Sequence, residues 1–244
     1  MCGRFLSLSG LDDLATHLAV DEVATDPLPI RYNVAPSTEI YAAITHQGRR
    51  RLGTLRWGFV PPWATSLRGG RQPINARVET VATSRMFAQS FAHRRCLIPA
   101  DGFYEWRAAT DSQPKQPFHL ADPAGDPLVF AGIWTAWRDP QDPDASPVYS
   151  TAIVTAEARG DIARLHHRMP VMLPRQLWDE WAGTAPEDAP HLLDAVAALG
   201  APQLTATAIS TRVNNVRNDG PELLEPVGDR PVGDRPVGDR PVGY

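Results

Sequence analysis

Residues 128–137 read LVFAGIWTAW, and residues 148–156 read VYSTAIVTA. Both runs are rich in β-branched and aromatic residues and are bounded by Pro, Gly or Asp, which is typical of strands. Three further runs have the same character: TLRWGFV at 54–60, RCLIPA at 95–100 and LTATAIS at 204–210. Strands therefore dominate the predicted secondary structure.

Helical periodicity is clear in four shorter places. They are a stripe of Leu11, Leu14 and Leu18, a helix over 81–91 capped by Thr80, a helix over 175–183 opened by Pro174, and a helix over 190–200 ending on Gly200. The elements do not alternate regularly between strand and helix, which argues against a doubly wound parallel sheet. We expect an α+β fold of mainly antiparallel, twisted β-sheets in a barrel-like core, with short flanking helices and long loops.

The length of 244 residues suits one sizeable domain. Hydrophobic residues at 43% and charged residues at 21% are ordinary globular usage. The chain ends in PVGDRPVGDRPVGDRPVGY, a short repeat whose Pro and Gly sustain neither helix nor paired strand. We predict a catalytic domain over 1–226 and a disordered tail over 227–244.

Composition also excludes several classes of protein. No run approaches the roughly 20 apolar residues of a membrane span, and MCGRF does not resemble an export signal. Cys2 and Cys96 cannot form a disulfide framework, and no Cys/His cluster has metal spacing. We therefore expect a cytoplasmic monomer without metal or cofactor. The net charge of −4 argues against coating nucleic acid by bulk electrostatics, so any DNA binding needs a local patch.

Cys2 is the first residue with distinctive chemistry. A small second residue normally permits removal of Met1, which leaves a cysteine carrying both a thiol and a free α-amine. The α-amine has a pKa near 8, against about 10.4 for lysine, so it is the better imine former at neutral pH. Such an aminothiol can close an imine into a thiazolidine, which makes an aldehyde the natural target. The alternative is an inert, buried cysteine after the initiator.

Several ordered sequence blocks resemble the SRAP family, the SOS-response-associated peptidases that include abasic-site shield proteins of bacteria and eukaryotes. The blocks are MCGRF at 1–5, RYNVAPST at 31–38, RWGFVPPW at 56–63, INARVET at 74–80, RCLIPADGFYEW at 95–106, FAGIW at 130–134, HHRMPVML at 166–173 and STRVNNVRNDGPELLEPV at 210–227. The resemblance implies that Cys2, once exposed, crosslinks to the ring-opened sugar of an abasic site in single-stranded DNA. It also implies self-reversal and an autopeptidase activity that removes Met1.

The resemblance assigns roles to three further residues at the sugar. Asn75 matches the asparagine that holds the opened sugar, Glu105 matches an acid–base carboxylate, and His166 matches the histidine that assists ring opening and crosslink reversal. Elementary chemistry supports these roles, because opening a cyclic hemiacetal requires proton transfer. An amide suits orienting a hydroxyl, since it both donates and accepts. His167 remains the alternative to His166, because either ring could face the site.

Arginines and tryptophans are the predicted DNA contacts. The resemblance implies that Arg77 and Arg168 grip phosphates beside the lesion, and Arg4 brings positive charge next to the terminus. Single strands are held by stacking bases on aromatic rings, and we select Trp106 and Trp63 for that role. The residues Trp134, Trp178, Trp181 and Cys96 are expected in the core.

Three rival functions stay open at this point. Some glutamine amidotransferases and other N-terminal-nucleophile hydrolases also begin with Met, Cys and Gly, and they use the terminal amine as a base. A plain peptidase would cleave external peptides. A non-catalytic DNA-binding module would hold DNA without Cys2. Glutaminase activity against crosslinking to abasic DNA discriminates the first rival, and cleavage confined to Met1 would explain a peptidase label without any external substrate. For the third, Cys2→Ala would leave DNA retention unchanged.

Overall fold

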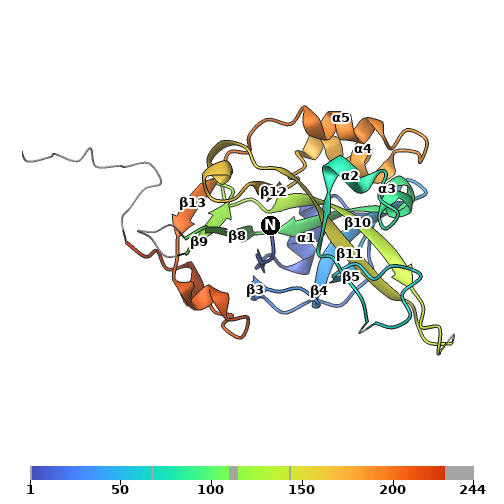
Figure 1. The fold of residues 1–244 in the computed structure, drawn as a ribbon, viewed down its shortest axis with the longest axis horizontal. Coiled ribbons are helices and arrows are strands. Elements are labelled where there is room, and N and C mark those ends of the chain that lie inside the picture. Colours follow the sequence, from blue (N-terminus) through green and yellow to red (C-terminus); the bar gives the residue numbers. More distant parts are fainter. Residues whose placement is uncertain (1, 68, 110–114, 143, 229–244) are drawn as a thin grey trace, which may run out of the picture.

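The computed structural model describes residues 2–67, 69–109, 115–142 and 144–228. Its strands form two sheets (Figure 1). The smaller sheet has five strands in the spatial order β13 (Thr205–Ala208), β9 (Gln116–Ala121), β8 (Gly102–Arg107), β1 (Phe5–Ser7) and β3 (Arg31–Val34). All four pairings in this sheet are antiparallel. The strand nearest the N-terminus, β1, therefore has a hydrogen-bonded neighbour on each side, β8 and β3.

The larger sheet has eight strands. Its main path runs β12 (Arg168–Pro170), β11 (Val148–Glu157), β10 (Leu128–Trp137), β7 (Arg95–Ala100), β4 (Glu39–His46), β5 (Arg49–Trp57) and β2 (Glu22–Val23), while β6 (Asn75–Arg77) pairs with β11. A short parallel pairing of β5 with β11 curls this sheet into a partial ring, not a closed barrel. The predicted α+β class with mainly antiparallel sheets is confirmed.

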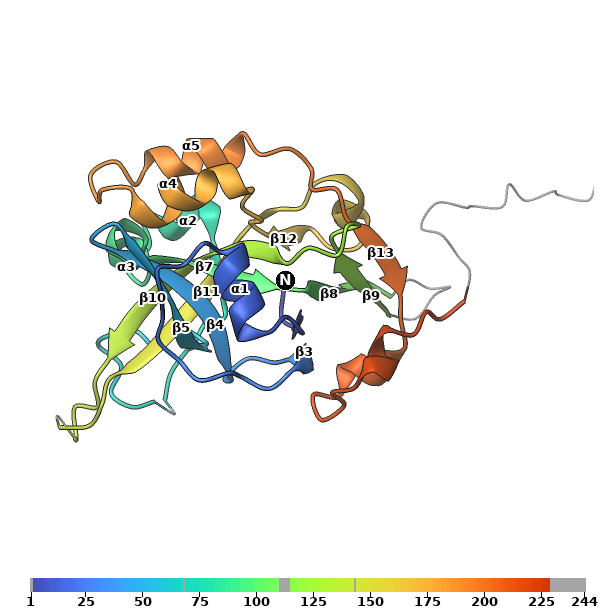
Figure 2. The ribbon, with the colours of Figure 1, turned by 180° about the vertical axis from the view of Figure 1, so that it is seen from behind.

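Short helices flank the sheets, as expected from the sequence. The α-helices are α1 (Leu11–His17), α2 (Val78–Val81), α3 (Ala88–His93), α4 (Trp178–Gly183) and α5 (His191–Ala197). Single 3₁₀ turns are η1 (Gly160–Arg164), η2 (Arg175–Leu177), η3 (Thr211–Asn214) and η4 (Pro221–Leu224). Seen from behind, α1 lies close to the N-terminal strand while α4 and α5 lie together at one end of the molecule (Figure 2).

The predicted helix over 81–91 is wrong. Thr80 lies inside α2, and its carbonyl accepts the amides of Thr83 and Ser84, which close a turn there. The hydroxyl of Ser84 then accepts the amide of Met86, in the manner of a helix cap. A second helix, α3, starts only after that turn, so the local side-chain hydrogen bond divides the segment in two.

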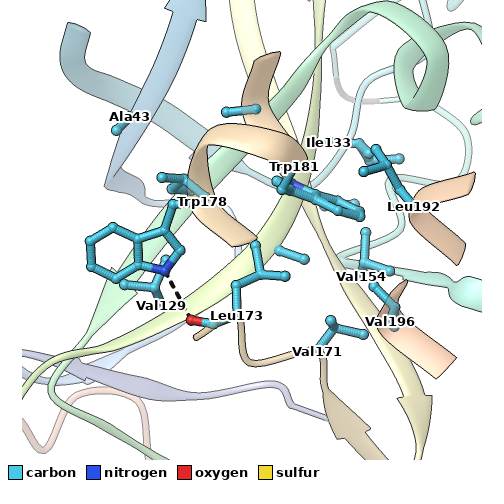
Figure 3. Packing of buried hydrophobic residues seen from close by; sticks show 14 of the residues in the cluster. Ala43, Val129, Ile133, Val154, Val171, Leu173, Trp178, Trp181, Leu192 and Val196 are labelled. Atoms are coloured by element: carbon cyan, nitrogen blue, oxygen red, sulfur yellow. Dashed lines mark hydrogen bonds between the residues drawn. The ribbon is translucent and has the colours of Figure 1, made fainter. Parts of the chain in front are cut away.

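Two large apolar clusters stabilise the fold. One packs α4 and α5 on the larger sheet around Trp178 and Trp181, and the indole Nε1 of Trp178 donates to the carbonyl of Leu173 at 2.9 Å (Figure 3). The other is built from strands of both sheets and contains Cys2 and Cys96, each fully buried. The predicted core positions of Cys96, Trp178 and Trp181 are confirmed, whereas Trp134 is only partly buried at the edge of the second cluster.

The predicted disordered tail covers residues 227–244, of which 229–244 lie outside the described part of the chain. Within the described ranges, no helix has the length and apolar character needed to cross a membrane.

Candidate functional site

Cys2 lies three residues before β1, with none of its surface exposed. Its carbonyl oxygen accepts a hydrogen bond of 3.0 Å from Nδ2 of Asn75. Asn75 is the first residue of β6, which runs parallel to β11 and pairs with it at Ile153. The larger sheet thus supplies the amide that holds Cys2, just before the first strand of the smaller sheet. In the described residues, Oδ1 of Asn75 is buried without a hydrogen-bond partner.

Glu105 reaches the same place from β8 and is 2% exposed. Burial raises the pKa of the Cys2 thiol far above its usual range, and the negative charge of Glu105 raises it further. Gly102 at the start of β8 has φ of 150°, and a Cβ there would lie 2.5 Å from Nε2 of His119. Only glycine fits this close approach, so it fixes the entry into the strand that carries Glu105.

His166 follows η1 and lies against the main chain of Arg168. Its Nδ1 is 2.9 Å from the Arg168 amide nitrogen and 3.2 Å from the Arg168 carbonyl oxygen. Neutral Nδ1 can accept from the N–H, and protonated Nδ1 can donate to the carbonyl, so both states have a partner. Burial lowers the pKa of His166, while the negative charge of Glu105 opposes that effect.

His167 is exposed and stacks on His166, with ring centroids 4.3 Å apart. The charge of Glu105 acts on both Cys2 and His166, which ties these three groups to one location. The geometry thus favours His166 over His167 as the acting histidine, although its catalytic role stays a prediction. Together with Asn75, the site combines a nucleophile, an amide and two groups that can carry protons.

The predicted phosphate arginines differ in their surroundings. Arg77 is exposed at the end of β6, two residues from Asn75. Arg168 is 9% exposed at its side chain and forms a two-point ion pair with Glu79. Its Nη2 also donates to the carbonyl of Thr155 at 2.6 Å. Arg77 is therefore available to a phosphate as it stands, whereas Arg168 is already bound within the protein.

Arg4 and Trp106 also have protein partners. The guanidinium of Arg4 donates to Asn33 Oδ1 at 3.1 Å and to the carbonyl of Val213 at 2.7 Å. The half-buried indole of Trp106 donates to Asn214 Oδ1 at 2.7 Å. Trp63, in contrast, is 56% exposed, which leaves its ring open to a base. These DNA contacts stay predictions.

In the ranges that the structure describes, no group of three or more His, Cys, Asp or Glu is arranged to hold a metal ion.

A protein-family model described as SOS response associated peptidase (SRAP) matches residues 1–216. The chain belongs to the SRAP family.

Two bacterial relatives match over nearly the whole chain, and a vertebrate relative matches over part of it. Abasic site processing protein YoqW of Bacillus subtilis is 34% identical over 226 residues, which is 92% of this chain and 99% of the relative. Abasic site processing protein YedK of Escherichia coli is 35% identical over 235 residues, covering 93% and 100%. Abasic site processing protein HMCES of Pongo abelii is 29% identical over 210 residues, covering 73% of this chain and 57% of that protein.

Solved structures agree on the fold. A Bacteroides thetaiotaomicron protein superposes with a TM-score of 0.75 at 18% identity and covers 93% of this chain and 100% of its own. A phage-related protein of Bordetella bronchiseptica has a TM-score of 0.64 at 30% identity, with coverage of 85% and 94%.

Sequence reasoning missed several residues of this SRAP site. Glu79, Asn33 and Asp219 all lie in blocks that carry the family resemblance, yet none was given a role. Glu79 follows Arg77 by two residues, and its nearness to that cation was a usable signal. The C-terminal partners of Asn33 and the β3 partners of Asp219 lie 180 or more residues away in the chain, so no local pattern could reveal them.

Proposed function

We propose that this SRAP protein processes abasic sites in single-stranded DNA by bonding to them through Cys2 after Met1 has been removed. The observation that carries the proposal is the hydrogen bond from Asn75 to the carbonyl of Cys2, and the charge of the buried Glu105, which acts on both Cys2 and His166, supports it. The relatives named abasic site processing proteins support the substrate class.

The proposed reaction begins at the closed sugar. A proton moves to the ring oxygen as the anomeric hydroxyl loses one, and the aldehyde appears. The α-amine of Cys2 attacks the aldehyde carbon, and loss of one water gives an imine. The sulfur then adds to the imine carbon while its proton passes to the nitrogen, which closes a thiazolidine. Glu105 and His166 supply the proton transfers, and Asn75 orients the terminus and the opened sugar.

The thiol needs help from a base, because burial and Glu105 both favour its protonated form. Proton transfer to a neighbouring group during ring closure avoids forming a free thiolate in this environment. The amine is the nucleophile that reacts first, and the chain offers Lys115 as its single side-chain competitor. The higher pKa of lysine makes the α-amine the more reactive group at neutral pH.

The preference for a single strand rests on the exposed ring of Trp63 and on Arg77 beside Asn75. A ring that stacks on an unpaired base and an arginine that binds phosphate are the usual means of holding single strands. Removal of Met1 is part of the same proposal: water adds across the Met1–Cys2 peptide bond and releases methionine. We propose that the site itself performs this hydrolysis.

The central test is adduct formation on a denaturing gel. Wild-type protein, Cys2→Ala and the buried-cysteine control Cys96→Ser are incubated with abasic single-stranded DNA, undamaged DNA and abasic duplex. We expect a heat-resistant adduct with wild type and Cys96→Ser on the abasic single strand, less on duplex, and none with Cys2→Ala. Equal adduct with Cys2→Ala would overturn the proposal. Mass spectrometry identifies the thiazolidine and the loss of Met1, and a glutaminase assay tests the amidotransferase alternative.

A further inference from the structure

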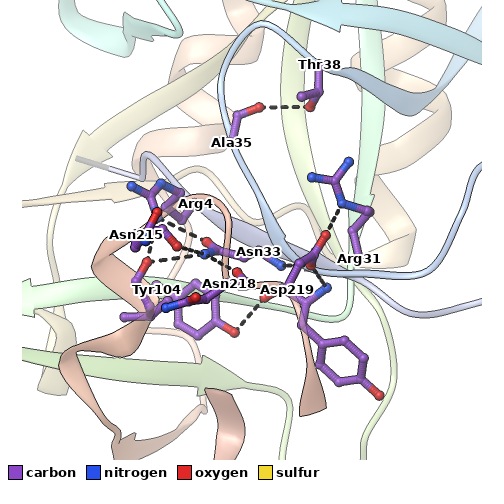
Figure 4. Close-up of polar contacts among 11 residues, drawn as sticks. Arg4, Arg31, Asn33, Ala35, Thr38, Tyr104, Asn215, Asn218 and Asp219 are labelled. Carbon is purple, nitrogen blue, oxygen red and sulfur yellow. Dashed lines mark hydrogen bonds and ion pairs between the residues drawn. The ribbon is translucent and has the colours of Figure 1, made fainter. Parts of the chain in front are cut away.

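Asn33 of β3 is a buried hydrogen-bonding centre beside the N-terminal strand. It has no exposed surface, and its Nδ2 faces the carbonyls of Val213, Asn215 and Asn218 at 3.2, 3.2 and 2.9 Å (Figure 4). Its Oδ1 accepts from Arg4 at 3.1 Å. Every hydrogen-bonding atom of the amide is therefore used, and the amide can have only this orientation.

The guanidinium of Arg4 closes the same network from the other side. Besides Asn33, it donates to the carbonyls of Val213 at 2.7 Å and Asn214 at 3.2 Å. The main-chain carbonyl of Arg4 accepts the amide of Tyr104 at 3.0 Å. Both the backbone and the side chain of Arg4 are therefore fixed, two residues after Cys2.

Asp219 anchors the C-terminal segment to β3. Its Oδ1 accepts the amides of Tyr32 at 2.6 Å and Asn33 at 2.8 Å, and its Oδ2 binds Nε of Arg31 (Figure 4). The family match ends at residue 216, so this anchor lies just beyond it. Residues 213–219 thus bind to both Arg4 and Asn33, and they hold the chain at a point two residues after Cys2.

We propose that Arg4 is a positioning residue that acts through Asn33 and residues 213–219 to fix the backbone from which Cys2 presents its amine and thiol. This inference rests on the proposed function. An N-terminal residue has a chain on one side only, so its direction depends on anchors such as Asn75 at its carbonyl and Arg4 two residues later. Correct placement of two reacting groups is worth large rate factors, and a displacement of about 1 Å can cost about a hundredfold.

Arg4→Lys separates positioning from phosphate binding, because lysine keeps the charge but loses the forked donors. At saturating abasic DNA we expect the crosslinking rate constant to fall roughly tenfold or more. We expect the Kd for undamaged single-stranded DNA to change less than about twofold, because no phosphate contact is lost. Arg51→Lys, a basic replacement at an exposed pair with Glu22, is the control and should change neither quantity.

A second measurement is independent of DNA. Iodoacetamide labelling followed by peptide mass analysis reports how freely Cys2 is presented. A loosened terminus is more accessible, so Arg4→Lys should label faster at Cys2 than wild type, while buried Cys96 stays at the wild-type rate. The same pattern is expected for Asn33→Ala. The double variant should be no worse than the more affected single variant, because both residues act through the same network of hydrogen bonds to residues 213–218.

The proposal fails if Arg4→Lys leaves both the crosslinking rate and Cys2 labelling at wild-type values. It also fails if Arg4→Lys weakens binding and reduces the salt dependence without slowing the covalent step, because Arg4 would then be a phosphate contact. If wild type forms no adduct at all, the proposed function is wrong, and the labelling comparison still decides whether Arg4 positions Cys2.

Discussion

The guanidinium of Arg168 binds the carboxylate of Glu79 at two points, with nitrogen–oxygen distances of 2.5 and 3.0 Å. The hydrogen bonds from Arg168 hold the pKa of the Glu79 carboxyl below its usual range. Because the main chain of Arg168 contacts Nδ1 of His166, an anchor on the Arg168 side chain also fixes the ring of the histidine. Glu79 is thereby connected to His166 through Arg168.

Replacing Glu79 should slow crosslinking through His166. In Glu79→Gln the two-point ion pair is lost, and we expect a rate reduction of about tenfold at saturating DNA, with partial recovery in Glu79→Asp. Single-turnover gel assays well below the Tm of each variant measure this. Glu157→Gln, an exposed carboxylate directly opposite Arg168 on β11, is the matched control. If the crosslinking rate falls equally in Glu79→Gln and Glu157→Gln, Glu79 does not act through Arg168 and His166.

His166 should titrate below the ordinary histidine range. Burial lowers its pKa and the charge of Glu105 raises it, so Glu105→Gln should lower the pKa further. Proton NMR titration of the ring gives both values directly. The neutral ring is the form present above the folded pKa, so the base function of His166 persists to a lower pH than an unperturbed histidine allows. A higher pKa in Glu105→Gln would rule out the electrostatic contact.

Glu105→Gln should change alkylation of the Cys2 thiol and crosslinking to abasic DNA in opposite directions. The glutamine removes a negative charge that raises the Cys2 pKa, so iodoacetamide should label Cys2 faster than in wild type. Crosslinking to abasic DNA should nevertheless slow by about a hundredfold, since general acid–base groups contribute roughly 10²- to 10⁴-fold. The two assays are run on the same preparation. If the labelling rate and the crosslinking rate both rise in Glu105→Gln, Glu105 has no proton-transfer role.

The local sequence predicted the bounds of some strands correctly. The strand over 128–137 is β10 without a shift, and 95–100 is β7. The strand placed at 54–60 instead spans Arg49–Trp57, because Gln47 and Gly48 form a turn with positive φ that starts the strand earlier. The strand begins with three arginines, which do not look like strand residues in the sequence. One of them, Arg50, is nevertheless buried and forms an ion pair with Asp179.

The candidate site was predictable as a set of chemical groups, but its supports were not. Cys2, Asn75 and Glu105 follow from chemistry and family resemblance, and the structure brings them together. The ion pair of Arg168 joins residues 89 positions apart, and the amide of Asn33 joins residues 180 or more apart. Such contacts arise from sheet pairing between distant segments, which no local periodicity records.

Trp63 should contribute to binding of the unpaired strand. The ring is 56% exposed, and stacking a base on an aromatic ring is worth about 1 to 3 kcal/mol. Trp63→Ala should therefore weaken binding of single-stranded DNA by about five- to a hundredfold and leave the Tm nearly unchanged. Fluorescence anisotropy measures the Kd. Tyr149→Ala removes a comparably exposed ring, at 47%, from β11 and should leave the Kd unchanged.

His119 of β9 should make the protein less stable in acid. Burial lowers its pKa to about 4, and its Nε2 has no hydrogen-bond partner among the described residues. In the unfolded chain the pKa is about 6.5, so between these values the unfolded state binds more protons. The contribution of neutral His119 is therefore complete above about pH 6.5 and is lost as the pH falls toward 4, by up to about 3 kcal/mol.

His119→Gln should remove that part of the pH dependence, because glutamine does not titrate. Urea unfolding at pH 7, 6, 5 and 4 gives the free energy of unfolding for both proteins, and the difference between wild type and variant should shrink toward acid pH. His46→Gln, at an exposed histidine of β4, should keep the wild-type slope. The prediction fails if His119→Gln loses stability between pH 7 and 4 as steeply as wild type does. The acid sensitivity would then come from carboxylates whose pKa is lowered by an ion pair, such as Glu79 against Arg168, and not from the buried imidazole.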